Sequence, residues 1–73
     1  MKTYRIAIAF PYRDSQAEWN EALDCLTAAV DWLDRNGRRQ HMIEAFTDHT
    51  DDEATAVIVL SDPDTAVMLR LAL

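Results

Sequence analysis

Residues 54–60, "ATAVIVL", decide the expected fold, because they are apolar on both faces of a strand. Successive side chains of a strand point to opposite faces of its sheet. Thr55 is the only polar residue of this stretch, so neither face is suited to water. Such a strand lies in the middle of a sheet or has both faces covered. The sequence therefore predicts an inner strand here, and the rest of the chain has to supply its neighbours.

Two other segments are expected to be strands. Residues 3–10, "TYRIAIAF", alternate between large apolar residues and smaller or polar ones, and Pro11 ends the pattern. Residues 40–47 alternate less regularly, since Met42 and Phe46 share a parity that Glu44 interrupts. This second segment is expected at a sheet edge.

A long helix is expected over residues 15–36. Asp14 or Ser15 caps its start, Glu18 completes a capping box with Ser15, and Gly37 ends it. The predicted core stripe recurs at helical spacing and consists of Trp19, Ala22, Leu23, Leu26, Val30 and Leu33.

A second helix is expected to follow the inner strand. It begins at an Asp62 cap with Pro63 in its first turn and runs to about residue 70. Residues 70–73 fit either more helix or a short strand, since Val67, Leu69, Leu71 and Leu73 also alternate.

The predicted order is β-α-β-β-α, within one compact domain spanning residues 1–73. A right-handed crossover through the long helix places the first strand beside the third. The fold class expected is α+β: a small ferredoxin-like plait with a three-stranded antiparallel sheet, helices on one face, and a fourth strand missing or very short. The junction at residues 57–66, "VIVLSDPDTA", resembles that of RNA-recognition-motif domains, which supports the plait. Val57 and Val59 stand where those domains carry base-stacking aromatics, which argues against RNA binding.

Charge and composition restrict the partners and the location. The formal net charge is −6, and the one basic cluster is Arg35, Arg38 and Arg39. Direct binding to nucleic acid is therefore not expected, whereas an acidic face suits a basic partner, including the DNA-binding groove of another protein. Cys25 is alone, and no segment has the length of a signal-peptide core or a membrane span. The sequence predicts a soluble cytoplasmic protein without membrane contact.

Residues 48–53, "DHTDDE", are either a metal or acid–base site or a solvated turn that precedes the inner strand. Metal sites need three or four converging ligands, usually from more than one element. We interpret the stretch as a hairpin turn of five or six residues and expect no metal and no cofactor. Cys25 lies mid-helix beside Asp24, which would raise its thiol pKa. We expect no enzyme activity and no catalytic residue.

Two surfaces remain as candidates for binding. Trp32 lies to the side of the core stripe, where it either covers the sheet edge or anchors a partner. The surrounding helix face contributes the other candidate partner-binding residues, Asp24, Ala28, Asp31 and Asp34. Self-association through the first strand's edge or the helix-free sheet face is the second candidate, with Arg5, Ala7, Ala9, Val57 and Val59.

The ending at residues 57–73, "VIVLSDPDTAVMLRLAL", resembles that of small acidic accessory proteins encoded by bacteriophages. The resemblance implies a host- or virus-directed binder or inhibitor, located in the host cytoplasm. The expected function is a non-enzymatic protein that covers a basic surface of a macromolecular partner. The alternative is a structural module that acts mainly as a homodimer.

Overall fold

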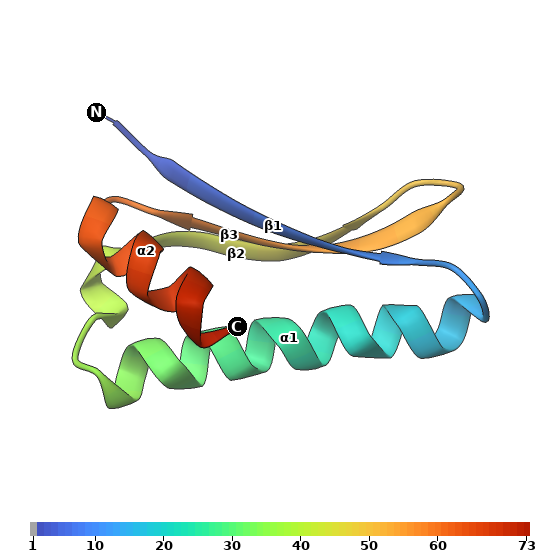
Figure 1. Ribbon diagram of the computed structural model, residues 1–73, viewed down its shortest axis with the longest axis horizontal. Coiled ribbons are helices and arrows are strands. Elements are labelled where there is room, and N and C mark those ends of the chain that lie inside the picture. Colours follow the sequence, from blue (N-terminus) through green and yellow to red (C-terminus); the bar gives the residue numbers. More distant parts are fainter. Residues whose placement is uncertain (1) are drawn as a thin grey trace.

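The computed structural model describes residues 2–73. Along the chain it forms β1 (Tyr4–Pro11), α1 (Ser15–Arg35), a short 3-10 helix η1 (Arg39–His41), β2 (Met42–His49), β3 (Glu53–Leu60) and α2 (Pro63–Ala72). The three strands make one antiparallel sheet in the order β1-β3-β2. Figure 1 shows both helices on the same side of this sheet. The predicted inner strand and the pairing of the first strand with the third are confirmed, and the chain is an α+β protein.

The ends of α1 follow from local hydrogen bonding. Asp14 is the N-cap and accepts a hydrogen bond from the Gln16 N–H at 3.2 Å. At the other end Gly37 takes a left-handed conformation with φ of 66°. The Gly37 N–H donates to Asp34 at 3.2 Å and the Arg38 N–H donates to Leu33 at 2.8 Å. These two bonds form a Schellman motif, which needs a residue in the left-handed conformation. Glycine adopts this conformation without steric cost.

The second helix begins as the sequence predicts and extends further. Asp62 accepts hydrogen bonds from the Thr65 N–H at 3.0 Å and from the Thr65 hydroxyl at 2.6 Å. Pro63 occupies the first turn, where its missing N–H costs nothing. The helix continues through Ala72, so the chain end that was left open between helix and strand is helical.

The core lies between the sheet and the two helices. Its main cluster joins β1, β3 and both helices and contains Ile6, Ala29, Leu33, Ile58, Leu60 and Leu69. A smaller cluster of Ala22, Ala54 and Ala56 lies nearer the start of α1. The small alanine side chains at this end let α1 approach β3 closely, and larger neighbours such as Trp19 and Phe10 pack around them.

The buried face of α1 differs from the predicted stripe. Ala29 is fully buried and Cys25 and Trp32 are partly buried, whereas Leu23 is 43% exposed. At about 100° per residue, the buried face is turned roughly 60° from the predicted one, away from Leu23 and Val30. The cause is tertiary, because α1 packs mainly against β3 and β1 and less against the edge strand β2, while α2 adds contacts on the other side. The side of α1 that faces α2 is covered, and the side toward β2 stays open.

The second strand also differs from expectation. It starts and ends two residues later than predicted, and a β-bulge lies between Met42 and Glu44. The bulge changes which residues share a face, because one extra residue inverts the alternation. Met42 packs against the main cluster, while Phe46 pairs with Val57 on the helix-free face. The shared parity of Met42 and Phe46 in the sequence therefore does not place them on the same face.

Candidate functional site

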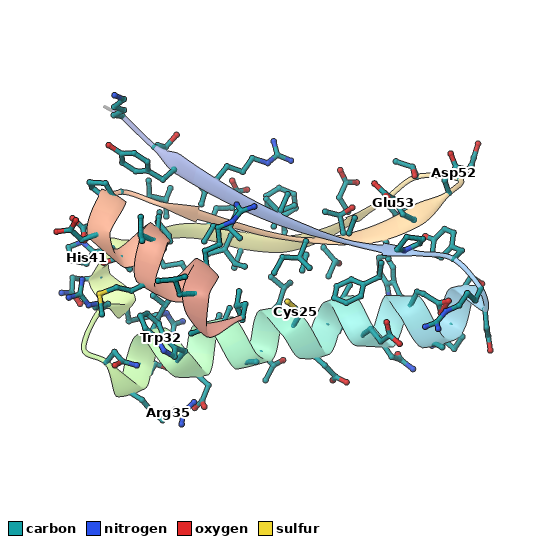
Figure 2. The ribbon with its side chains drawn as sticks, viewed as in Figure 1. Cys25, Trp32, Arg35, His41, Asp52 and Glu53 are labelled. Atoms are coloured by element: carbon teal, nitrogen blue, oxygen red, sulfur yellow. The ribbon has the colours of Figure 1, made fainter. Side chains whose placement is uncertain are left out.

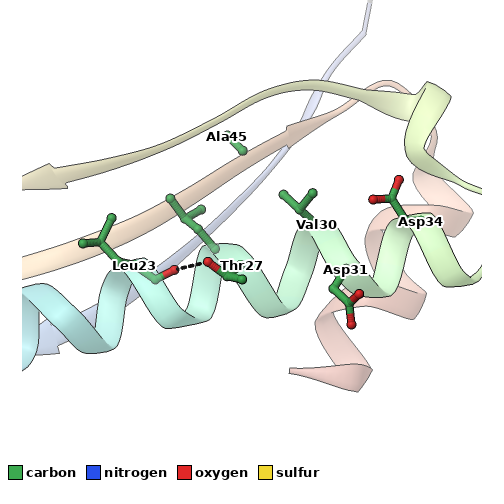
Figure 3. A pocket seen from close by; sticks show the side chains of 7 residues that line it. Leu23, Thr27, Val30, Asp31, Asp34 and Ala45 are labelled. Atoms are coloured by element: carbon green, nitrogen blue, oxygen red, sulfur yellow. Dashed lines mark hydrogen bonds between the residues drawn. The ribbon is translucent and has the colours of Figure 1, made fainter.

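A groove lies between α1 and β2. It has a volume of about 480 Å³ and is lined by Leu23, Leu26, Thr27, Val30, Asp31, Asp34 and Ala45. Figure 3 shows six of these side chains arranged along α1 and Ala45 of β2 facing them. Six lining residues come from α1, so the surface of this helix forms most of the groove. Ala45, on the edge strand β2, forms the rest.

The floor of the groove is apolar. Leu23 is 43% exposed, Val30 and Leu26 are partly buried, and Ala45 adds a methyl group from β2. The hydroxyl of Thr27 donates to the Leu23 carbonyl oxygen at 3.0 Å, so it is satisfied within the helix and leaves its methyl group available. Burying such exposed side chains stabilises a complex by about 25 cal/mol per Å² of apolar surface before the costs of association.

The rim of the groove carries the aspartates of α1. Asp31 forms an ion pair with Arg35 at 3.0 Å, and Asp34 accepts both hydrogen bonds from the Arg39 guanidinium, at 3.0 and 3.1 Å. All four side chains are half-exposed or more. Asp24 lies further along the same exposed side of α1. The rim is therefore acidic, but both aspartates that line the groove, Asp31 and Asp34, are partly neutralised by arginines of the same chain.

The remaining predicted partner-binding residues lie away from the groove. Trp32 is partly buried and packs against the main cluster, about 160° around the helix from Val30. Figure 2 shows Trp32 on α1 near the lower end of α2. Ala28 is exposed on the face between Trp32 and Asp24. The structure thus places Trp32 within the packed part of the molecule, and the groove residues Leu23 and Val30 are the apolar groups next to the aspartates.

The helix-free face of the sheet holds the predicted self-association residues. Arg5, Ala7 and Ala9 are exposed, Val59 is partly buried, and Val57 is fully buried. Val57 pairs with Ala7 on one side and with Phe46 on the other. The β-bulge in β2 thus makes Phe46 a neighbour of Val57. The alternation in the sequence had assigned Phe46 to the other face.

The acidic stretch at residues 48–53 is a tight hairpin. The strands extend further into it than expected, so residues 50–52 alone form the turn. The Thr50 hydroxyl accepts hydrogen bonds from the N–H groups of Asp52 and Glu53, each at 3.2 Å. His49 turns toward α1, where its ring meets the Trp19 ring edge-to-face at 5.4 Å between centroids. Within residues 2–73 no three His, Cys, Asp or Glu side chains are placed to share a metal ion.

The sequence predicted a capping box of Glu18 with Ser15, but Asp14 is the N-cap and Glu18 is a buried carboxylate. Its Oε1 accepts hydrogen bonds from the N–H groups of Arg13 and, at 3.0 Å, Asp14. The Asp14 bond is the main cause that lowers the pKa of Glu18, while burial opposes it and Arg13 adds to the lowering. This reciprocal contact with the Asp14 cap shows that Glu18 fixes the loop between β1 and α1. The signal in the sequence that could have indicated this role was a charged residue at a helix position that is buried.

Cys25 has no feature of an activated nucleophile. Burial raises the pKa of its thiol, so the thiolate is disfavoured. Its neighbours in the smaller cluster are apolar.

Another hollow, of about 320 Å³, lies where α1 begins and is lined by Ser15, Gln16, Trp19 and His49.

Comparison with known proteins finds no family model, no curated protein and no solved structure that matches this chain. No helix within residues 2–73 combines the length and apolar character that a membrane span requires.

Proposed function

We propose that the protein is a small non-enzymatic binding protein that receives a basic amphipathic segment of another protein in the α1–β2 groove. The observation that carries this proposal is the combination of an apolar floor, formed by the exposed Leu23 and the partly buried Val30, with a rim of aspartates. An apolar floor alone would suit many partners, and the aspartates select for lysine and arginine. By occupying a basic segment, the protein would inhibit the binding of that segment to its own partner, including a nucleic acid.

The rim arginines are compatible with this role. Exposed ion pairs such as Asp31–Arg35 and Asp34–Arg39 contribute only about 0–1 kcal/mol each. A partner's basic side chain therefore replaces the intramolecular arginine at little cost. The net charge of −6 acts over a longer range, and it steers a basic partner toward the molecule at low ionic strength.

The strand order supports a scaffold for binding. We infer that β1-β3-β2, with both helices on one face, is a ferredoxin-like plait without its fourth strand. In this arrangement α1 lies over the sheet and α2 covers only one of its sides. The exposed side, next to β2, is where the proposed segment binds. The bacteriophage-type accessory role remains part of this proposal, and the resemblance of residues 57–73 is its support.

The experiment uses a synthetic amphipathic helix of leucine and lysine, and a counterpart in which glutamate replaces every lysine. We expect the lysine peptide to bind, with an affinity that falls as salt rises, and the glutamate peptide not to bind. Leu23→Gln should weaken binding of the lysine peptide about tenfold. Met68→Gln is the matched control, because Met68 on α2 is 40% exposed and Leu23 is 43% exposed.

A third variant tests the rim. Arg39→Gln frees Asp34 from its ion pair and should strengthen binding of the lysine peptide about two- to fivefold, the scale of one exposed ion pair. Isothermal titration calorimetry measures all the affinities. Equal binding of the two peptides, or equal losses for Leu23→Gln and Met68→Gln, would contradict the proposal.

A further inference from the structure

The outer edge of β1 lies beside a second apolar surface. A groove of about 350 Å³ runs between this edge and α2, and its lining includes Tyr4, Ile6 and Val67. On α2, Val67 is 61% exposed and Leu71 is 82% exposed. Because β1 ends the sheet, one side of its backbone has no strand partner among residues 2–73. An apolar edge strand of this length is normally paired or covered.

The unpaired basic side chains collect at one end of this edge. Four arginines form ion pairs with aspartates or glutamates of the chain: Arg13, Arg35, Arg38 and Arg39. Within residues 2–73 no ion pair involves Lys2, Arg5 or Arg70. Arg5 and Arg70 both line the groove between β1 and α2, and Lys2 is two residues before β1. The acidic molecule therefore has a basic corner where β1 begins, with Glu44 as the acidic residue in line with Arg5, two strands away through Val59.

The other end of β1 adjoins the acidic hairpin. Pro11, the last residue of β1, pairs with Glu53. The Tyr12 N–H donates to the carbonyl oxygen of Asp52 at 3.0 Å. Asp51, Asp52 and Glu53 therefore lie where β1 ends, and they have the opposite charge to the corner where it begins. The β1 edge is thus charged with opposite signs at its two ends.

We propose that a second copy of this chain pairs with the β1 edge, antiparallel and about a two-fold axis, to form a continuous six-stranded sheet. Antiparallel pairing of β1 with itself brings the basic corner of each copy to the acidic hairpin of the other. The alternating pattern is also self-complementary. In a pairing centred on Ala7, Ile6 faces Ile8 and Tyr4 faces Phe10 on the helix side.

Arg5 and Glu53 are opposite charges that this pairing brings toward each other on the helix-free face. With Ala7 at the axis, Arg5 lies opposite Ala9 of the second copy, whose small side chain leaves the face open. Ala9 in turn pairs with Thr55, two residues from Glu53 on the same face of β3. Arg5 and Glu53 of the second copy are thus about two strand spacings, or about 10 Å, apart across the sheet, and are offset by two residues along it.

The same two residues are far apart within one chain. Arg5 pairs with Val59, six residues along β3 from Glu53, a separation of about 20 Å. An interaction between them is therefore intermolecular. The two net charges of −6 repel each other, so the charge complementarity at the edge and the apolar contacts of Val67 must exceed this repulsion.

Sedimentation velocity and equilibrium experiments test the proposal. The wild-type protein should be a dimer at high micromolar concentration. Arg5→Glu and Glu53→Arg should each raise the dimer dissociation constant about tenfold, since each replaces two symmetry-related attractions with repulsions. The double variant Arg5→Glu/Glu53→Arg should restore it to within about twofold of the wild-type value. Circular dichroism checks that each variant is folded.

Two results would overturn the proposal. One is a wild-type protein that stays monomeric at high micromolar concentration. The other is a folded double variant whose dimer is no stronger than that of the single variants. A dimer that is insensitive to both single variants would likewise place the interface elsewhere.

A disulfide experiment tests the register. In a Cys25→Ala background, Ala7→Cys places two thiols opposite each other at the axis, within the Cα separation that a disulfide allows. Mild oxidation should link this variant into a covalent dimer within the range of concentrations where the wild-type protein dimerises. Ala9→Cys is the control, because it faces Arg5 and should link much more slowly. Equal linking rates would contradict the pairing centred on Ala7.

Discussion

The two sides of α1 have similar apolar side chains and opposite environments. On the side facing α2, Ala29 and Leu33 are fully buried and Trp32 is partly buried. On the side facing β2, Leu23 is 43% exposed and lines an open groove. The difference arises because the first side packs against β3, β1 and α2, whereas the second side meets only the edge strand β2 among the strands and helices of residues 2–73. Apolar residues on a helix thus indicate surfaces that favour burial. The rest of the fold determines which of these surfaces are buried within the chain.

The largest expected effect compares two leucines of α1 that differ in burial. Leu33→Ala should lower the free energy of unfolding by about 2–5 kcal/mol, because it leaves a cavity in the main cluster. Leu23→Ala removes the same atoms from the groove and should cost less than about 1 kcal/mol. Urea denaturation measures both. Similar losses for the two variants would show that the two sides of α1 are equally packed.

The second effect concerns Trp32, on the packed side. Trp32→Ala should lower the free energy of unfolding by about 2 kcal/mol, less than the 3–5 kcal/mol typical of a fully buried tryptophan. Binding of the leucine–lysine peptide should be unchanged once the variant is folded, since Trp32 lies away from the groove. A folded, equally stable Trp32→Ala protein that loses peptide binding would restore Trp32 as the anchor and move the site to the other side of α1.

The third effect is a dependence of stability on pH at the two helix starts. The Thr65 hydroxyl and N–H lower the pKa of Asp62 below its ordinary value of 3.8, and the Asp14 N–H lowers that of Glu18 below 4.5. The unfolded chain therefore binds more protons than the folded one as the pH falls past these ordinary values. Stability is fully present above about pH 5 and is lost as the pH falls through the lowered pKa values.

Two substitutions test this dependence. Asp62→Asn keeps a residue that caps helices well, and Glu18→Gln keeps the shape of the side chain, so both remove mainly the charge. Each should lower stability at pH 7 and flatten the loss of stability between pH 5 and pH 2, measured by urea denaturation at each pH. A Glu18→Gln protein with the wild-type dependence on pH would show that the buried carboxylate at the start of α1 does not contribute to it.

The sequence was sufficient for the elements whose signals are local. The Asp62 cap, the Gly37 stop and the alternation of residues 3–10 each depend on neighbouring residues, and the structure has these elements within about two residues of the prediction. For the start of α1 the sequence left Asp14 and Ser15 open, and the structure has Asp14 as the cap. The apolar character of residues 54–60 also predicted their inner position, since β1 and β2 pair with the two edges of β3. These features depend on hydrogen bonds and side-chain periods that a short segment fixes by itself.

Only the tertiary structure decided the burial of α1 and the faces of β2. The predicted stripe was centred on the largest apolar residues, including Leu23 and Val30. The observed face instead includes Ala29 and Cys25, because α1 packs mainly against β3 and β1 and less against the edge strand β2. The bulge between Met42 and Glu44 moved Phe46 to the face opposite Met42, and no residue in this stretch indicates a bulge. Both features arise from contacts between segments distant in the chain, and periodicity within one segment does not contain that information.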